Sequence, residues 1–482
     1  MFPSIISIVQ EHAARDPQGQ PARLLEAAAQ LAPSLASAGA VAVSADNGEA
    51  WLVADLATLL SCKAAIPLPH FFSAAQVQWA VDSAGADTLL TDRPELPHWQ
   101  ALGFRLGGQQ GGLAWLTRQC QPVDLPPRTA KITFTSGSTG HAKGVCLSEG
   151  AQLAVAGSIA GMMRELSASR HLCTLPLPVL LENVAGAYAA LIADVECVLP
   201  SLAGVGWSGS SQWDARSFLQ CVAEQRIESA IILPQMLKAL LPLLGEYDTS
   251  SLRMVAVGGA RVSAELLQLA RVQGLPVYEG YGLSECSSVV CFNHPGADRP
   301  GTVGKPLPHA KVRINGEGEL EVAGSHFLGY LGQPASESRL EWLPTGDLAT
   351  IDADGFVSIT GRRKHLLISS FGRNISPEWV ESELLGQGGI LQAAVFGEAK
   401  PWLSAVLFAP GLSDVALASA VAKANVSLPD YARVNRYVRA TEPFTDANGL
   451  ATSNGRNRRD AIASHFYNSL EALYSSTGEL TA

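Results

Sequence analysis

The sequence predicts an α/β fold, in which a large multi-sheet N-terminal domain with a β subdomain is followed by a small, mobile α+β domain. Three observations lead to this prediction. Short apolar runs of strand type alternate with longer helical stretches, a pattern typical of mainly parallel sheets. Three of these runs end in loops rich in glycine and polar residues. The chain has 482 residues, enough for roughly two to four domains and a large core.

Three of the predicted strands are each followed by a loop whose composition suits ligand binding. Residues 131–134 lead into TSGSTGHAKG, residues 254–257 into GGA, and residues 277–278 into EGYGLSE. In open α/β sheets, ligands bind at the carboxyl ends of the strands. We therefore expect the three loops to line one crevice.

The later elements predict the β subdomain and a separate C-terminal domain. Short alternating strands with tight turns fill residues 314–332, and residues 352–355 form a hairpin turn. A helix then begins after Ser376, which can cap it, with Pro377 at its first position. Two strands, LQAAVFG and LSAVLFA, and helices near residues 413–425 and 456–474 complete the chain. These elements divide it into domains at 1–361 and 362–482.

Composition excludes several classes of protein. The net charge of −10 argues against a general nucleic-acid binder, which needs a basic face. The start of the chain lacks the basic region of a secretory signal, and the longest uncharged stretch, residues 27–45, contains Pro33 and Gly39, so no membrane span is expected. The eight cysteines are scattered without a CxxC or a His/Cys cluster, which argues against a zinc site and suits a reducing cytoplasm.

The segment TSGSTGHAKG has the chemistry of a phosphate-binding loop. Its three glycines allow the backbone to approach a ligand closely, its four hydroxyls can donate hydrogen bonds, and Lys143 adds a positive charge. It is not a Walker A loop, because Ala142 stands where the second glycine of that motif belongs. A flexible Ser/Gly turn is the alternative interpretation.

Four further motifs are weak when taken singly. In YGLSE, Glu285 can hold Mg²⁺ beside phosphates or can simply be an exposed loop carboxylate. The sequence TGD at 345–347 is compatible with an ordinary turn, and GRRKHLL at 361–367 with a solvated basic linker. The group Arg456, Arg458 and Arg459 is compatible with a charged helix start.

In this order and at these separations, the motifs resemble the adenylate-forming superfamily of acyl-CoA synthetases, luciferases and peptide-synthetase adenylation domains. The resemblance extends from about Leu59 to about Ile462. TSGSTGHAKG matches the phosphate loop of the family, GGA its adenine and acyl-wall strand end, and YGLSE its YGx[TS]E motif. PTGDL matches [YRP]TGDL, GRRKHLLISSFGRNISPEWVE the hinge and following loop, and TSNGRNRR the place of the catalytic-lysine loop.

The resemblance implies an ATP-dependent acid–thiol ligase of the acyl-CoA synthetase type. A carboxylic acid attacks the α-phosphorus of ATP, pyrophosphate leaves, and the small domain rotates about a hinge near Lys364 before coenzyme A takes the acyl group. Mg²⁺, ATP and coenzyme A are the implied cofactor and cosubstrates. Two alternatives stay open: transfer of the acyl group to a carrier protein or an amine, and a non-catalytic acyl- or nucleotide-binding homologue.

The resemblance also assigns roles to residues at matching positions. Asp347 is expected to accept the ribose hydroxyls with help from Arg362, and Ser284 to reach the α-phosphate. Thr135 and Glu285 are the expected Mg²⁺ ligands, and Arg456, Lys143, Ser284 and Glu285 the catalytic group. The expected ATP-binding residues also include the phosphate-loop residues Thr135, Ser136, Gly137, Ser138, Thr139, Gly140 and Lys143, and the adenine-site residues Gly259, Ala260, Glu279, Gly280, Tyr281 and Gly282.

The final loop departs from the family pattern. The family usually has a Gly-Lys pair whose lysine bridges the α-phosphate and the attacking carboxylate, whereas this chain has Gly455-Arg456. Arginine keeps the charge but presents a planar fork, so the change is not neutral. Either Arg456 performs the task of the lysine, which we favour, or adenylation is slow and the protein has another function.

The acid-binding region is less well defined. Val179 stands where long-chain acyl-CoA synthetases often have histidine, and no aspartate is placed to pair an amino-acid ammonium. We expect a fatty acid, with an acyl pocket formed by Leu181, Val184, Ala185 and Gly258, although the first three also suit a core helix. Gly372 and Arg373 are expected to line the coenzyme A channel. The early LTY-like segment of the family is not recognisable.

Overall fold

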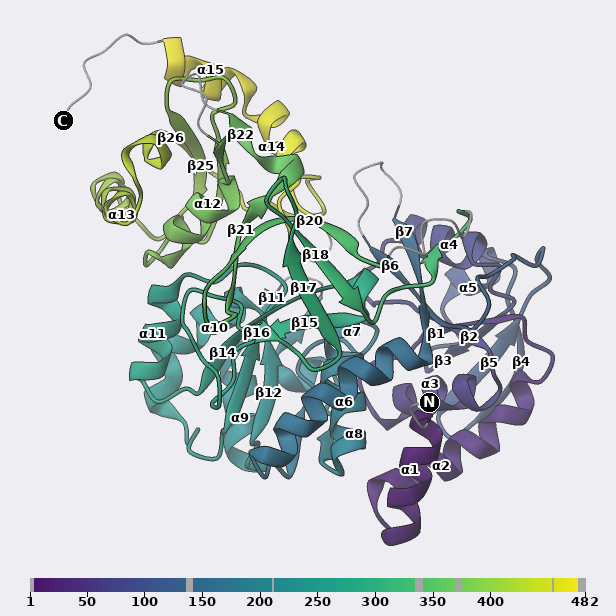
Figure 1. Ribbon diagram of the computed structural model, residues 1–482. Coiled ribbons are helices and arrows are strands. Elements are labelled where there is room, and N and C mark those ends of the chain that lie inside the picture. The colour runs from purple at the N-terminus through teal and green to yellow at the C-terminus, as the bar shows by residue number, and fades with distance from the viewer. Residues whose placement is uncertain are drawn as a thin grey trace.

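The computed structural model describes residues 4–135, 142–209, 212–333, 341–368, 374–452 and 455–475. Figure 1 shows a large N-terminal body and, at one end of it, a smaller unit formed by the last part of the chain. Several sheets with helices packed against them confirm the predicted α/β class. Among the described residues, no helix combines the length and apolar character needed to cross a membrane.

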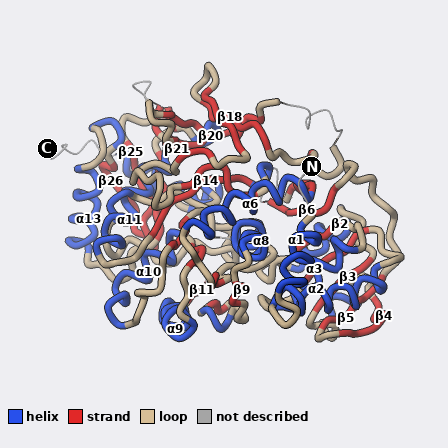
Figure 2. Tube along the Cα trace, turned by 60° about the horizontal axis from the view of Figure 1, so that its bottom comes forward, coloured by secondary structure: helices blue, strands red, loops and turns tan. Residues whose placement is uncertain are grey.

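The first sheet has eight strands in the order β19-β7-β6-β2-β1-β3-β5-β4. Its centre is parallel, and antiparallel strands flank that centre on both sides. Helices α1, α2 and α3 gather beside it (Figures 1 and 2). The strands are β1 Ala40–Ser44, β2 Ala64–Pro67, β3 Thr88–Thr91, β4 Arg105–Gln110, β5 Leu113–Thr117, β6 Thr129–Thr135, β7 Lys143–Ser148 and β19 Gly329–Tyr330; the helices are α1 Ile5–Arg15, α2 Gln20–Leu31, α3 Glu49–Leu60, α4 Ala74–Ser83 and α5 Pro97–Ala101.

The second sheet has seven strands in the order β16-β15-β14-β13-β12-β8-β9, and its β14-β13-β12-β8-β9 part is parallel. A two-stranded ribbon, β10 Trp207–Ser208 and β11 Gln212–Trp213, lies apart from it. The strands are β8 Arg170–Leu172, β9 Glu196–Val198, β12 Ser229–Ile232, β13 Met254–Val257, β14 Val277–Leu283, β15 Ser288–Phe292 and β16 Lys305–Pro306; the helices are α6 Glu149–Glu165, α7 Leu180–Glu182, the π-helix η2 Asn183–Tyr188, α8 Ala189–Ala193, α9 Ala215–Gln225, α10 Pro234–Leu240 and α11 Ala264–Val272.

The predicted β subdomain is a four-stranded antiparallel sheet, β17-β18-β20-β21. Its strands are β17 Ala310–Ile314, β18 Glu319–Gly324, β20 Leu343–Ile351 and β21 Val357–Arg362. The TGD motif lies inside β20, so its interpretation as an ordinary turn was wrong. The turn comes later, at residues 352–355, as expected. The N–H of Asp352 donates to the carbonyl oxygen of Phe356, and the carbonyl oxygen of Asp352 accepts from the N–H of Gly355.

The C-terminal unit packs helices on a three-stranded sheet, β24-β25-β26. The side chain of Ser376 caps α12 by accepting from Trp379 N, as predicted. A single helix was expected over residues 456–474. The structure has two helices there, α14 and α15, because the helix is interrupted at Phe466. The elements are β22 Leu367–Ile368, β23 Asn374–Ile375, α12 Pro377–Gly386, β24 Gln392–Phe396, β25 Leu403–Phe408, α13 Asp414–Val426, β26 Val434–Ala440, α14 Arg459–His465 and α15 Tyr467–Ser475.

The large body and the C-terminal unit have separate hydrophobic cores. The main core of the large body reaches Val357, and a separate core starts at Leu367 and runs to Val434. Short 3₁₀ turns connect several elements, and one of them, η7, lies between these two cores. The other turns are η1 Ala32–Leu35, η3 Ala203–Val205, η4 Leu241–Glu246, η5 Ser284–Cys286 and η8 Asp430–Ala432; η7 is Arg363–His365.

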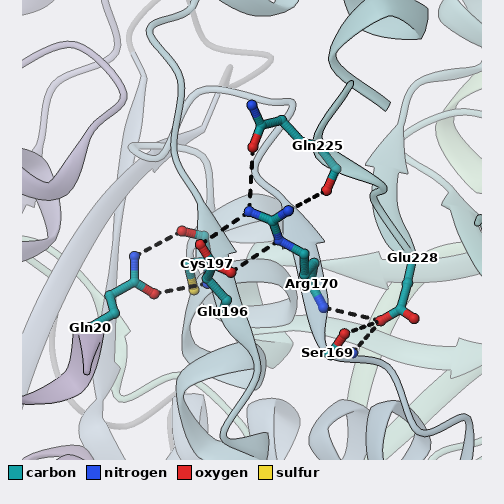
Figure 3. A network of polar contacts seen from close by, with 7 residues as sticks. All are labelled: Gln20, Ser169, Arg170, Glu196, Cys197, Gln225 and Glu228. Carbon is teal, nitrogen blue, oxygen red and sulfur yellow. Dashed lines mark hydrogen bonds and ion pairs between the residues drawn. The ribbon is translucent and has the colours of Figure 1, made fainter. Parts of the chain in front are cut away.

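A polar network holds together the amino ends of β8, β9 and β12 in the second sheet (Figure 3). Arg170 pairs with Glu196 through Nε at 3.0 Å, and Glu228 accepts from the hydroxyl of Ser169 at 2.6 Å. Gln20 exchanges two hydrogen bonds with the backbone of Cys197, at 2.8 and 2.9 Å. These contacts hold the strands together at their amino ends. The carboxyl ends of the strands face the candidate site.

Candidate active site

One cleft is lined by the residues that the sequence predicts for ATP and acid binding and that the structure describes. Val184 is the exception among them. The cleft has a volume of about 3270 Å³ and is bounded by the carboxyl ends of β12 and β13, the β20–β21 hairpin and α12. The predicted residues in its lining are Thr135, Lys143, Leu181, Ala185, Gly258, Gly259, Ala260, Glu279, Gly280, Tyr281, Gly282, Ser284, Glu285, Asp347, Arg362, Lys364 and Arg456.

Some predicted residues are not placed in this cleft. Val184 is completely buried within the core of the large body and is not part of the lining. All residues of the π-helix η2 are buried, and Val184 packs in the main hydrophobic core. Outside the described residues lie Ser136, Gly137, Ser138, Thr139 and Gly140 of the phosphate loop, and Gly372 and Arg373 of the expected coenzyme A channel.

The phosphate loop is carried by an antiparallel hairpin. Strands β6 and β7 bring Thr135 and Lys143 opposite each other in register. The ammonium of Lys143 lies 4.9 Å from the ring centre of Tyr330, a cation–π geometry. The hydroxyl of Tyr330 in turn donates to Glu285 Oε1 at 2.8 Å. Tyr330 therefore links the cation of the loop to the carboxylate predicted to hold a metal.

The EGYGLSE segment is mostly strand, which corrects its interpretation as a loop. It continues β14 because β15 turns back and pairs with it. Gly282 permits this close return, since a Cβ there would lie 1.8 Å from the carbonyl oxygen of Ser288. Ser284 and Glu285 follow in the turn η5. Burial raises the pKa of Glu279 to about 8, despite the opposing effects of the Val262 N–H and Arg261.

Asp347 is held in place by two side chains of the cleft. The hydroxyl of Tyr281 donates to Asp347 Oδ2 at 2.6 Å, and Arg362 Nε lies 2.9 Å from Oδ1. Burial, reinforced by Asp347, raises the pKa of Tyr281 well above its usual value, so the phenol keeps its proton. A carboxylate has about four acceptor positions, so Asp347 retains capacity for two more donors.

The irregular part of β20 beside Asp347 is held by Glu319, a residue that no sequence motif indicated. Gly346 has a φ of +76°, a left-handed conformation that favours glycine. Its N–H donates to Glu319 Oε1 at 2.7 Å, and Arg363 binds the other oxygen of Glu319 at 3.1 Å. No local sequence pattern predicts the role of Glu319, because its partners, Gly346 and Arg363, are distant in sequence.

Arg456 reaches from the C-terminal unit into the cleft. Its guanidinium donates to the carbonyl oxygen of Gly259 at 3.2 Å. Arg456 remains accessible to solvent. Partial desolvation by the walls of the cleft and the charge of Arg362 lower the pKa of Arg456, whereas Asp347 and Glu285 raise it. The guanidinium is therefore within electrostatic reach of the groups predicted for ribose and metal binding.

The two neighbouring arginines have other partners. Arg458 pairs with Asp446 at 3.1 Å, and Arg459 forms a two-pronged pair with Glu381 at 2.6 and 3.1 Å. Both partners belong to the C-terminal unit. The structure therefore distinguishes Arg456, which contacts the large body, from two arginines engaged inside their own unit.

On the acyl side, Leu181, Ala185 and Gly258 line the cleft. A Cβ at Gly258 would lie 3.5 Å from the Gly280 carbonyl oxygen and 3.9 Å from Leu181 Cδ2. Ala256, Ala230 and His171, on the neighbouring strands β13, β12 and β8, also line the cleft. This side of the cleft, which we call the apolar passage, is thus largely apolar.

His171 belongs to a buried polar cluster with Cys173 and Glu182, whose possible ligand atoms lie within 4.8 Å of one another. The scattered spacing of the cysteines does not predict this cluster; the fold creates it by bringing Glu182 of α7 beside His171 of β8. Glu182 accepts from the N–H groups of Thr174 and Leu175, at 3.0 and 2.7 Å, and lies 3.2 Å from His171 Nε2. These bonds explain the burial of the carboxylate without a metal ion.

Comparison with known proteins agrees with this geometry. A family model described as AMP-binding enzyme matches residues 22–331, more than half of the chain. The long-chain-fatty-acid–CoA ligase FadD15 of Mycobacterium bovis is 26% identical, and the alignment covers 88% of this chain and 86% of that protein. A feruloyl-CoA synthase of an Amycolatopsis species is 29% identical, covering 79% of this chain and 80% of that protein.

Solved structures share the fold. The anthranilate–CoA ligase AuaEII, solved in complex with anthranoyl-AMP, superposes with a TM-score of 0.80. The superposition covers 96% of this chain and 97% of that protein, with 17% identity. At this identity the likeness establishes the architecture of both the large body and the C-terminal unit.

Proposed function

This chain belongs to the AMP-binding enzyme family, and from that premise we propose that it activates a fatty acid with ATP and transfers the acyl group to coenzyme A. The class of reaction, that of an AMP-forming acid–CoA ligase, follows from the family and from relatives named as CoA ligases. The substrate and the residue roles below are the proposal.

The observation that carries the proposal is the meeting of Arg456 with the nucleotide side of the cleft. Its guanidinium donates to the carbonyl oxygen of Gly259, and the charges of Arg362, Asp347 and Glu285 influence its pKa. A carboxylate and a triphosphate repel each other, so adenylation needs a positive group between them. Arg456 occupies the loop position of the usual lysine and supplies that charge.

The other residues then divide the work of holding ATP. Asp347, oriented by Tyr281 and Arg362, accepts the ribose hydroxyls. Ala260, Glu279, Gly280 and Tyr281 surround the adenine. Lys143 and the hydroxyls of the phosphate loop bind the β- and γ-phosphates, and Ser284 binds the α-phosphate. Each role uses a group whose donor or acceptor chemistry suits its partner.

A Mg²⁺ ion fits the donor chemistry of this site. The carboxylate of Glu285 and the hydroxyl of Thr135 are hard oxygen donors, and Mg²⁺ is commonly bound by one or two protein groups plus phosphate oxygens. Glu285 is held by the hydroxyl of Tyr330 at 2.8 Å. When bound, the ion would neutralise phosphate charge.

The small domain, from residue 362 onward, acts as the lid in this proposal. We place the hinge at Lys364, between the two hydrophobic cores. Closure brings Arg456 into the cleft and shields the acyl-adenylate from water. Gly372 and Arg373 would then line the coenzyme A channel for the second half-reaction.

The apolar passage beyond Gly258 supports a fatty acid. Its lining by Leu181, Ala185 and Ala256 suits an uncharged chain. The named activity of FadD15 agrees with this choice, whereas that of the feruloyl-CoA synthase makes aryl acids the natural comparison. We also propose a cytoplasmic location, which the scattered cysteines support.

A product assay tests the proposal. The protein is incubated with Mg-ATP, coenzyme A and a panel of fatty, aryl and amino acids, and mass spectrometry searches for acyl-AMP and acyl-CoA. We expect both products from fatty acids. Acyl-AMP without acyl-CoA would point to a carrier protein or an amine as acceptor. Products from amino acids alone would overturn the substrate assignment, and ATP binding without any product would favour a non-catalytic homologue.

A further inference from the structure

Lys238, on α10 of the large body, makes three hydrogen bonds to the C-terminal unit. Its ammonium donates to the carbonyl oxygens of Leu385 at 2.6 Å, Gln387 at 3.2 Å and Ile390 at 2.5 Å. A lysine ammonium has three N–H donors. All three are therefore used on one partner segment, which begins at the C-terminal end of α12.

The acceptors suit a cation. The last carbonyls of a helix lack partners within the helix and carry the negative end of its dipole. Burial lowers the pKa of Lys238 to about 8, so the ammonium is still the main form at neutral pH. A charged donor makes these bonds stronger than bonds between neutral groups.

The contact is close to the place where Arg456 enters the cleft. Gly386, at the end of α12, lies against the large body, since a Cβ there would be 2.9 Å from Ser263 Oγ. Ser263 caps α11 directly after the loop whose Gly259 accepts from Arg456. Lys238 and Arg456 line the same cleft from opposite domains. The position of α12 and the position of Arg456 are thus set by one interface.

We propose that Lys238 is a positioning residue for the adenylation half-reaction, holding the C-terminal unit so that Arg456 stays in the cleft. This inference rests on the proposed function. The three hydrogen bonds of Lys238 join the two domains, so a rotation of the small domain would break them. They must therefore break before coenzyme A reacts. Lys238 thereby favours the first half-reaction and opposes the change to the second.

The test compares the two half-reactions in Lys238→Met, which keeps an unbranched chain and removes the donors. Single-turnover formation of acyl-AMP should fall about tenfold, the size expected for losing charged hydrogen bonds. Thioester formation from supplied acyl-adenylate and coenzyme A should be unchanged or faster. Lys423→Met, which removes an exposed lysine from α13, is the matched control and should alter neither.

A double variant separates positioning from general damage. If Lys238 acts through Arg456, then adding Lys238→Met to Arg456→Ala should slow adenylation by less than about twofold. Equal losses in both half-reactions, additive losses in the double variant, or a wild-type adenylation rate for Lys238→Met would each overturn the proposal.

Small-angle X-ray scattering of the full chain tests the contact without any activity. Wild type should match the compact arrangement of the two domains, and Lys238→Met should be more extended. If wild type forms no acyl-adenylate but the variant still opens, the proposed function fails and the contact stands. Identical scattering profiles would refute the positioning role even in an active enzyme.

Discussion

On the nucleotide side of the cleft, Asp347 is fixed by named polar partners, Tyr281 at 2.6 Å and Arg362 at 2.9 Å. On the proposed acyl side, Gly258, Ala185 and Leu181 line the cleft. These residues are uncharged, and they define only the volume available to the acid. The nucleotide is the same in every adenylation, so its side can be built from polar groups at fixed positions. The acid differs among family members, so its side depends on volume, and that difference can be tested by substitution.

The largest effect is expected on the nucleotide side, from Asp347→Ala. The change removes the proposed ribose acceptor and leaves Arg362 without its carboxylate partner. We expect ATP to bind about a hundredfold more weakly or worse, since losing hydrogen bonds to a charged group costs roughly 1.5–3 kcal/mol each. Calorimetry measures the affinity. Asp354→Ala, which removes an exposed carboxylate from the same hairpin, should bind ATP normally; near-normal binding by Asp347→Ala would remove it from the site.

Arg456→Ala tests whether arginine replaces the usual lysine. Single-turnover adenylation should slow by about a hundredfold, because removing one well-placed group that stabilises the transition state electrostatically costs roughly 2.7–4 kcal/mol. Rapid-quench measurement of acyl-AMP gives the rate. Arg458→Ala, whose side chain pairs with Asp446, is the control and should keep the wild-type rate. An unchanged rate for Arg456→Ala would exclude it from the chemistry.

A change beneath the acyl side should affect stability. A Cβ at Gly186 would lie 2.2 Å from Glu182 Oε1 and 2.8 Å from His171 Nε2. Both groups are buried and hydrogen-bonded, so Gly186→Ala should destabilise the large body by about 1–3 kcal/mol. The midpoint of urea unfolding reports it. Gly157→Ala, where a Cβ meets nothing within 4 Å, should leave the midpoint equal or higher; equal midpoints for both variants would contradict the account.

The smallest effect concerns the shape of the acyl passage. A Cβ at Gly258 has ordinary contacts at 3.5 and 3.9 Å, so Gly258→Ala should behave like wild type. Gly258→Val adds an isopropyl group, two methyl groups more than alanine, and we expect kcat/KM to shift from long toward short acids by about tenfold. The KM for ATP should not move. A parallel loss for all acids would show that the substitution damages the nucleotide side as well.

Short sequence motifs predicted many of the residues that the fold gathers in the cleft around Asp347. Asp347, Glu285 and Tyr281 lie in short motifs whose spacing is dictated by one constant ligand, and the structure brings them into one cleft. The strands at residues 131–134, 254–257 and 277–278 and the Ser376 cap were also predictable, because apolar runs and capping are local signals.

Features set by distant contacts could not be predicted in this way. Val184 was expected in the pocket, but periodicity alone does not say which face of a helix meets the core. Tyr330 and Lys238 act on partners far away in the chain, and no local pattern reports such partners. The choice among Arg456, Arg458 and Arg459 likewise required the fold, which pairs two of them inside the C-terminal unit.

Acid-dependent exchange of labelled pyrophosphate into ATP tests the central claim most directly, because it reports reversible adenylation without needing the second acceptor. We expect exchange by the wild-type protein that depends on a fatty acid and is absent without acid. Measurable ATP binding with no exchange for any fatty, aryl or amino acid would contradict the claim that this cleft adenylates a carboxylate.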